Sequence, residues 1–140
     1  MTKRDRNYLI VFLSITLLFV GYMFIKNTGV KAYRVIQKHT YNEETLTEGK
    51  YNGRFEAYNI KFAEVSFSLE NGKIKDFKIP TLIHAPWINV RTSIIDTITK
   101  KDTLDFDAIS GATGTSLYVK AAIREAINNA GSDTSITLKK

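Results

Sequence analysis

The sequence predicts an α+β fold, a small antiparallel sheet with packed helices, preceded by one N-terminal transmembrane helix. Three observations predict it: a long stretch without charge near the N-terminus, a central region where hydrophobic and polar residues alternate, and later segments with helical spacing. The 140 residues suffice for one modest domain and an appendage. We expect a tail and anchor at 1–26, a stalk at 27–48 and a folded domain at 49–140.

The uncharged stretch runs from Asn7 to Ile25 and predicts a membrane-spanning helix. At ~1.5 Å per residue it nearly spans the ~30 Å hydrocarbon core of a bilayer. A cleaved signal peptide is the competing interpretation. Its apolar part is usually shorter, and the nearest cleavage-like segment, Val30-Lys31-Ala32, carries a lysine. The chain has no cysteine, which excludes a lipid-modified cysteine. We therefore favour an uncleaved, single-pass anchor with membrane lipid as its partner.

Charge divides the chain near the same place. Residues 1–40 hold seven Lys and Arg against one acidic residue, a net charge of +6, whereas residues 41–140 hold thirteen of each and are neutral. The basic segments flank the apolar stretch and suit anionic lipid headgroups. Nucleic-acid binding would require the positive charge on the folded domain, so no nucleic-acid partner is expected. The flanking charges do not decide the orientation, but so short a tail usually stays cytoplasmic. We expect the domain on the extracytoplasmic side of the cell membrane.

The stalk and the first strand are marked by local signals. Asn27-Thr28-Gly29 can break the membrane helix, and the segment at 42–49 is polar and acidic. A first strand is expected around 54–58, entered through Asn52-Gly53. With two later strands it would make a three-stranded antiparallel sheet.

The next two strands form a predicted hairpin. Hydrophobic and polar residues alternate over 62–69, which indicates a half-buried strand. Asn71-Gly72 follows, the strongest short hairpin signal, since a type I′ turn needs positive φ at both central residues. In the returning strand, Ile74 and Phe77 differ in parity. That difference predicts a bulge or a strand buried on both faces.

Two helices complete the predicted domain. Pro86 suits a first helical position, and hydrophobic residues recur at helical spacing over about 86–100. The last helix has a complete i, i+3, i+4, i+7, i+8 stripe from Val119 to Ile127. Gly131 is expected to cap it, and Ser132–Leu138 to add an edge strand.

The segment Asp107–Ser116, just before the last helix, is the candidate site. Its helix is expected to start at about Gly114 to Ser116, and the first N–H groups of a helix favour anions. Gly111 and Ala112 would let a phosphate approach the main chain closely. Asp107 could bind a metal ion or hydrogen-bond the turn. The alternative is ordinary capping, because Ser and Thr are preferred N-caps. The residues alone leave both open.

The run Asp107-Ala108-Ile109-Ser110-Gly111-Ala112-Thr113 resembles the Asp-x-x-Ser/Thr-Gly-Ala-Thr motif of the FMN-binding domain family, and Thr115-Ser116 extends the match. The resemblance covers about residues 49–130. This part of the chain is similar to the domain found in the C subunit of the sodium-translocating NADH:quinone oxidoreductase and in the G subunit of the Rnf complex. There a flavin transferase moves FMN from FAD onto the motif threonine as a phosphoester. The resemblance implies attachment at Thr113 and cofactor binding by Asp107, Ser110, Gly111, Ala112 and Thr115.

The loop at 81–87 is the candidate contact for the flavin ring. Trp87 could stack on the ring, although a lone Trp on an amphipathic stripe is more often a core residue. His84 could donate a hydrogen bond to a reduced flavin, although a loop histidine is more often solvated. His39 lies in the expected stalk without a partner, so no metal site is expected.

The resemblance implies a membrane-anchored extracytoplasmic flavoprotein that carries FMN and transfers electrons. Its expected partners are a flavin transferase for maturation and a quinone-linked or dehydrogenase donor in the membrane. Such a chain is an electron carrier or redox subunit rather than a stand-alone enzyme. Two alternatives stay open: a module that binds FMN or another phosphate ligand non-covalently, and a structural interaction domain without cofactor.

Overall fold

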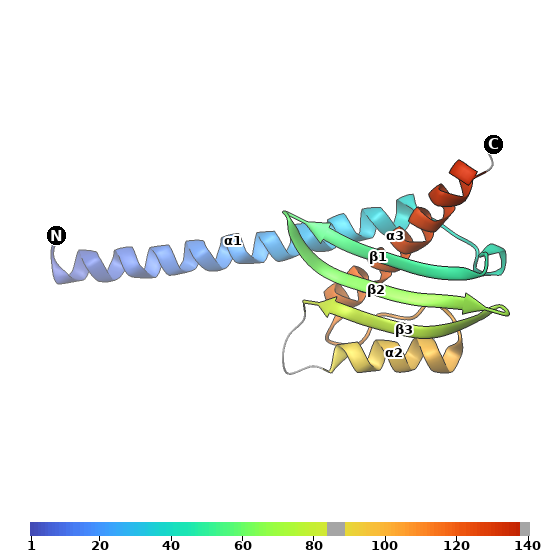
Figure 1. Cartoon of the computed structure of the whole chain (residues 1–140). Coiled ribbons are helices and arrows are strands. Elements are labelled where there is room, and N and C mark those ends of the chain that lie inside the picture. The colour runs from blue at the N-terminus through green and yellow to red at the C-terminus, as the bar shows by residue number, and fades with distance from the viewer. Residues whose placement is uncertain (84–88, 138–140) are drawn as a thin grey trace.

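The computed structural model describes residues 1–83 and 89–137, with side chains described through residue 130. Three antiparallel strands form one sheet in the order β1-β2-β3, and three helices accompany it (Figure 1). Helix α3 packs on β1 and β2, α2 packs on β3, and the C-terminal part of α1 packs on α3. The predicted α+β fold class is confirmed.

Helix α1, Lys3–Lys38, is a single helix of 36 residues. By length and composition it can span a membrane. The break expected at Asn27-Thr28-Gly29 is wrong. Thr28 and Ala32 are fully buried in the part of the molecule where α1 packs on α3, and the Thr28 hydroxyl donates a 2.9 Å hydrogen bond to the Phe24 carbonyl. Packing of this kind outweighs the ~1 kcal/mol that one glycine costs a helix. The expected stalk therefore contains a packed helical segment, followed by the short 3₁₀ helix η1, Glu43–Thr45.

The sheet consists of β1, Gly49–Ala57, β2, Ile60–Glu70, and β3, Lys73–Leu82. Asn71 and Gly72 have φ of 53° and 70°, as the predicted type I′ turn requires. The first hairpin turns at Tyr58-Asn59, also with positive φ at both residues, 55° and 59°. Asparagine tolerates positive φ, but without a glycine this pair is a weaker turn signal than Asn71-Gly72.

Strand β3 contains the predicted bulge. Between the pairs Ser66–Lys78 and Ser68–Lys75, β3 holds one residue more than β2. Asp76 lies in this interval with φ of 51°. The extra residue accommodates the change of parity along β3, so hydrophobic positions on either side of it can face the core.

Gly53 lies in the middle of β1, so its expected role in an entry turn is wrong. The inward positions of this strand are buried: Tyr51, Gly53, Phe55 and Ala57. A Cβ at Gly53 would lie 2.2 Å from the Ala122 carbonyl oxygen and 2.6 Å from the Ala126 Cβ. The glycine therefore lets α3 lie directly against the strand.

The two later helices differ from expectation at their ends. Helix α2, Val90–Lys101, begins four residues after Pro86, with Asn89 at its N-cap. Helix α3, Thr113–Thr137, continues past Gly131, so the predicted cap is wrong. Residues 132–137 are helical, which also contradicts the expected edge strand. One glycine costs a helix only about 1 kcal/mol, too little to end it by itself.

Candidate functional site

The predicted motif forms a tight turn that leads directly into α3. The Ala112 N–H donates to the Ile109 carbonyl at 2.9 Å, which closes the turn, and Gly111 has φ of 77°. Positive φ at this third position is typical of a type II turn and favours glycine. The Ala112 carbonyl then accepts the Ser116 N–H at 2.9 Å, the first hydrogen bond of the helix.

Thr113 is the first residue of α3, and its side chain is exposed. Asp107, Ser110 and Gly111 are also exposed, Thr115 is half-buried and Ala112 is buried. The first three N–H groups of an α-helix have no acceptor within the helix, and the helix dipole favours an anion beside them. Because Ser110, Gly111 and Ala112 have small side chains or none, a phosphate can approach these N–H groups. Helix starts of this kind bind phosphate groups in many proteins.

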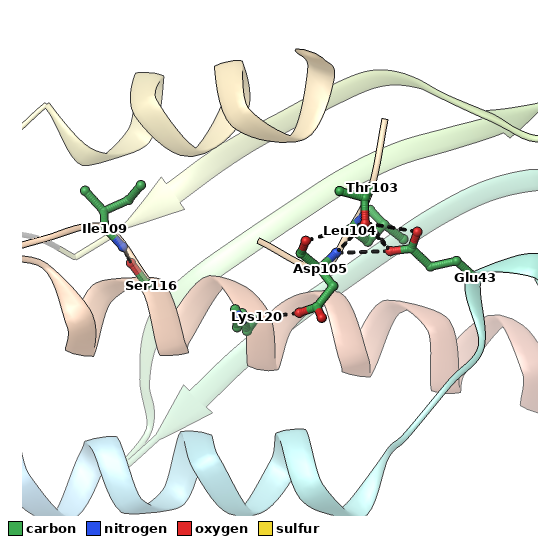
Figure 2. A network of polar contacts seen from close by, with 7 residues as sticks. All are labelled: Glu43, Thr103, Leu104, Asp105, Ile109, Ser116 and Lys120. Atoms are coloured by element: carbon green, nitrogen blue, oxygen red, sulfur yellow. Dashed lines mark hydrogen bonds and ion pairs between the residues drawn. The ribbon is translucent and has the colours of Figure 1, made fainter. Parts of the chain in front are cut away.

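Ser116 fixes the turn from inside the helix, a role that the sequence analysis missed. Its side chain is fully buried. The hydroxyl accepts a hydrogen bond from the Ile109 N–H at 3.0 Å (Figure 2). It also donates one to the Ala112 carbonyl at 3.0 Å. Ser116 lies one turn inside α3, so it is not the N-cap residue of this helix. It joins both ends of the turn to the helix.

Glu43 holds the chain segment that leads to the motif. Its carboxylate accepts hydrogen bonds from the backbone N–H groups of Leu104 and Asp105, at 2.7 and 3.0 Å, and from the Thr103 hydroxyl at 2.9 Å (Figure 2). A carboxylate that accepts backbone N–H groups makes strong, charge-assisted bonds. The sequence placed Glu43 in an acidic stalk, and no local pattern there indicates a partner sixty residues away.

Lys120 of α3 also contacts this segment. Its ammonium lies 3.3 Å from the Asp105 carboxylate and 5.3 Å from the centroid of the Phe106 ring. Because the Asp105 side chain is largely exposed, the ion pair contributes little stability. The buried Phe106 ring and the Glu43 bonds therefore do most to fix the segment before the turn.

Aromatic side chains of the sheet pack against the first turns of α3. The ring of buried Tyr118 lies 5.7 Å from that of Phe55 and 5.1 Å from that of Phe62, centroid to centroid. Burial raises the pKa of the Tyr118 hydroxyl. A Cβ added at Gly114 would come no closer than 3.9 Å to Tyr118. The start of α3 thus packs on the rings of Phe55 and Phe62 through Tyr118, and Gly114 has open space beside it.

His84 and Trp87, predicted to contact the flavin ring, lie outside the described residues. His39 does have a neighbour, because its Nε2 lies 3.7 Å from a Glu125 carboxylate oxygen. Over residues 1–83 and 89–130, no three His, Cys, Asp or Glu residues come together to hold a metal ion. Asp107 therefore has no companion ligands in that part of the chain.

Comparison with known proteins gives one match. The model of a family described as FMN-binding domain matches residues 25–128, which include the turn, α3 through Asn128 and the packed end of α1. No curated protein and no solved structure matches the chain. The match supports FMN as the ligand of this domain.

Proposed function

Because the chain belongs to the FMN-binding domain family, we propose that it carries FMN as a phosphoester on Thr113 and serves as a membrane-anchored electron carrier. The observation that carries this proposal is the placement of Thr113. Its hydroxyl is exposed at the first position of α3, beside a turn of small residues and the unpaired N–H groups of the helix start. An acceptor threonine has to be exposed in this way to enter the active site of a transferase.

The attachment step requires a flavin transferase and FAD as its substrate. The Thr113 Oγ would form a bond to the FMN phosphorus, the pyrophosphate bond of FAD would break, and AMP would leave with the electrons of that bond. The hydroxyl proton would pass to a base of the transferase. Once formed, the phosphoester keeps a negative charge, which the start of α3 stabilises.

Bound FMN supplies reversible electron transfer, while the protein supplies attachment and orientation. Ser116 and Glu43 hold the turn and the segment before it, so they would fix the position of the phosphate. Helix α1 would hold the domain at a membrane, where a quinone-linked or dehydrogenase donor can reach it. Covalent attachment is useful on the extracytoplasmic side, because a released FMN would be lost to the medium.

The attachment site can be tested by expressing the chain with a flavin transferase and measuring flavin fluorescence in the denatured protein band. We expect fluorescence in the unaltered chain and in Thr92→Ala, the control for an exposed threonine of α2 away from the motif, but none in Thr113→Ala. Fluorescence that persists in Thr113→Ala would refute this site. Flavin that separates on denaturation would favour a non-covalent module, and absence of flavin would favour a structural domain.

The orientation has its own test. Protease added outside intact cells, or outside spheroplasts where an outer membrane is present, should digest the folded domain. Protection of the domain would place it in the cytoplasm and remove the rationale for covalent retention.

A further inference from the structure

One end of the folded domain contacts α1 where its apolar segment ends. The ring of Tyr58, in the β1–β2 turn, lies 4.8 Å from the Phe24 ring between centroids, and the Asn27 amide donates a hydrogen bond to its hydroxyl. The Lys31 ammonium lies 3.7 Å from the centroid of the same ring. Phe24 belongs to the uncharged stretch, and Lys26 is the first charged residue after it. The contacts of Tyr58 therefore cross the boundary between the apolar and basic parts of α1.

This boundary determines the position of the β1–β2 turn along the normal of a bilayer that α1 spans. The uncharged stretch is about 28 Å long as a helix, close to the thickness of the hydrocarbon core. Its last turn therefore lies near the lipid headgroups, and so does the turn that contacts it. Helix α1 continues unbroken to Lys38 and packs on α3, so no flexible linker separates the domain from the span.

The same end of the domain carries exposed hydrophobic side chains. Among side chains described after α1, the large hydrophobic ones that are exposed are Tyr58, Ile60 and Ile83, at 41%, 42% and 45%. Tyr58 is in the turn, Ile60 begins β2, and the Ile83 N–H donates to the Phe62 carbonyl at 2.9 Å. Single exposed hydrophobic residues are ordinary, but a group confined to one end indicates a contact surface.

The surroundings of this surface match the chemistry of a phospholipid. A hollow of about 600 Å³ lies between α1 and the β1–β2 turn, lined by Val20, Met23, Phe24, Val30 and Tyr58 together with Lys26. Val20, Met23 and Phe24 precede the Lys26 ammonium along α1, an order that suits an acyl chain and a phosphate, respectively. Tyrosine is also enriched at the membrane–water interface.

We propose that Tyr58, Ile60 and Ile83 form a membrane-contact surface that rests on bilayer lipid at the level of its headgroups. The surface requires α1 to span the bilayer, but it does not depend on FMN. Helix α3 begins at this same end of the sheet, as its ring contact between Tyr118 and Phe62 also indicates (Figure 1). The candidate turn therefore lies on the membrane side of the domain.

The absence of cysteine from the chain allows a direct test. Single variants Ile60→Cys and Ile83→Cys would each carry a nitroxide label, in the full chain reconstituted into nanodiscs of phosphatidylcholine and phosphatidylglycerol. Lys73→Cys, at the opposite end of the sheet, is the matched control, and Ile15→Cys reports insertion of α1. Collision rates with oxygen, which concentrates in lipid, and with a water-soluble nickel complex measure the depth of each label.

We expect the labels at 60 and 83 to collide several-fold less often with the nickel complex than the label at 73, while the label at 15 collides mainly with oxygen. Equal nickel accessibility at 60, 83 and 73 would overturn the proposal and favour a protein partner for this surface. A water-exposed label at 15 would show that α1 does not span the bilayer and would overturn the proposal as well. Hydrogen exchange of the unlabelled chain gives a second measurement, since the bilayer should slow exchange at residues 57–62 more than at residues 70–74.

Discussion

Replacement of Glu43 tests whether the segment before the motif is held from a distance. In Glu43→Ala, the N–H groups of Leu104 and Asp105 and the Thr103 hydroxyl lose their carboxylate acceptor. Hydrogen bonds to a charged group contribute about 1.5–3 kcal/mol each, but the Asp105 N–H can turn to water. We therefore expect the free energy of unfolding to fall by roughly 2–4 kcal/mol.

Glu43→Gln separates the shape of this side chain from its charge. The amide oxygen can still accept both backbone N–H groups, so the expected loss is about 1 kcal/mol. Glu44→Ala is the matched control, because Glu44 lies in the same 3₁₀ helix with an exposed side chain. An exposed change of this kind should alter stability by ~0.5 kcal/mol at most.

Urea unfolding of the full chain in detergent would measure these differences, and hydrogen exchange would show where they arise. Exchange should accelerate at residues 103–112 in Glu43→Ala, where the anchoring bonds are lost. A loss in Glu43→Ala no larger than that in Glu44→Ala would refute the idea that the carboxylate holds this segment.

Three further changes test other contacts, with urea unfolding as the measurement. Gly53→Ala should lower the free energy of unfolding by several kcal/mol or prevent folding, since its Cβ would lie 2.2 Å from the α3 backbone. Gly29→Ala, whose Cβ would have no atom within 4 Å, should instead stabilise α1 by up to about 1 kcal/mol. Equal effects of the two changes would contradict the close packing of α3 on Gly53. Ser116→Ala should cost roughly 1–3 kcal/mol because the Ile109 N–H loses its acceptor, and an unchanged midpoint would count against that role. Burial raises the pKa of the Tyr41 hydroxyl, although the nearby Arg124 opposes the rise. Above the usual tyrosine pKa of ~10 the unfolded chain loses this proton while the folded chain keeps it, so the free energy of unfolding falls as pH rises. Tyr41→Phe should therefore lose less stability in alkali than the unaltered chain.

The sequence predicted those parts of the fold that depend on neighbouring residues. Asn71-Gly72 encodes its own turn, and the stripe from Val119 to Ile127 encodes the buried face of α3. The bulge in β3 followed from a change of parity. These features could be predicted because the backbone conformation of a few adjacent residues determines each of them.

Features that depend on distant contacts were missed. Glu43 has ordinary acidic neighbours, and its importance arises only when residues 103–105 fold against it. Gly53 looked like a turn residue because the approach of α3 has no signature in β1. In the candidate site, the motif identified the exposed Thr113, but the buried hydroxyl of Ser116 resembled a simple cap. The roles of His84 and Trp87 stay predictions.

The burial of Thr28 and Ala32 determines where the protein can be cut without damage. A soluble form that begins at residue 49 would lack the helical segment that covers α3 and would expose an apolar surface prone to aggregation. A form that begins at Lys26 would keep that cover and lose the tail, the uncharged stretch and the contacts of Phe24 with Thr28 and Tyr58. A protease that cleaves just after Ile25 would thus release a domain whose α3 is still covered, whereas cleavage after η1 would separate the domain from that cover.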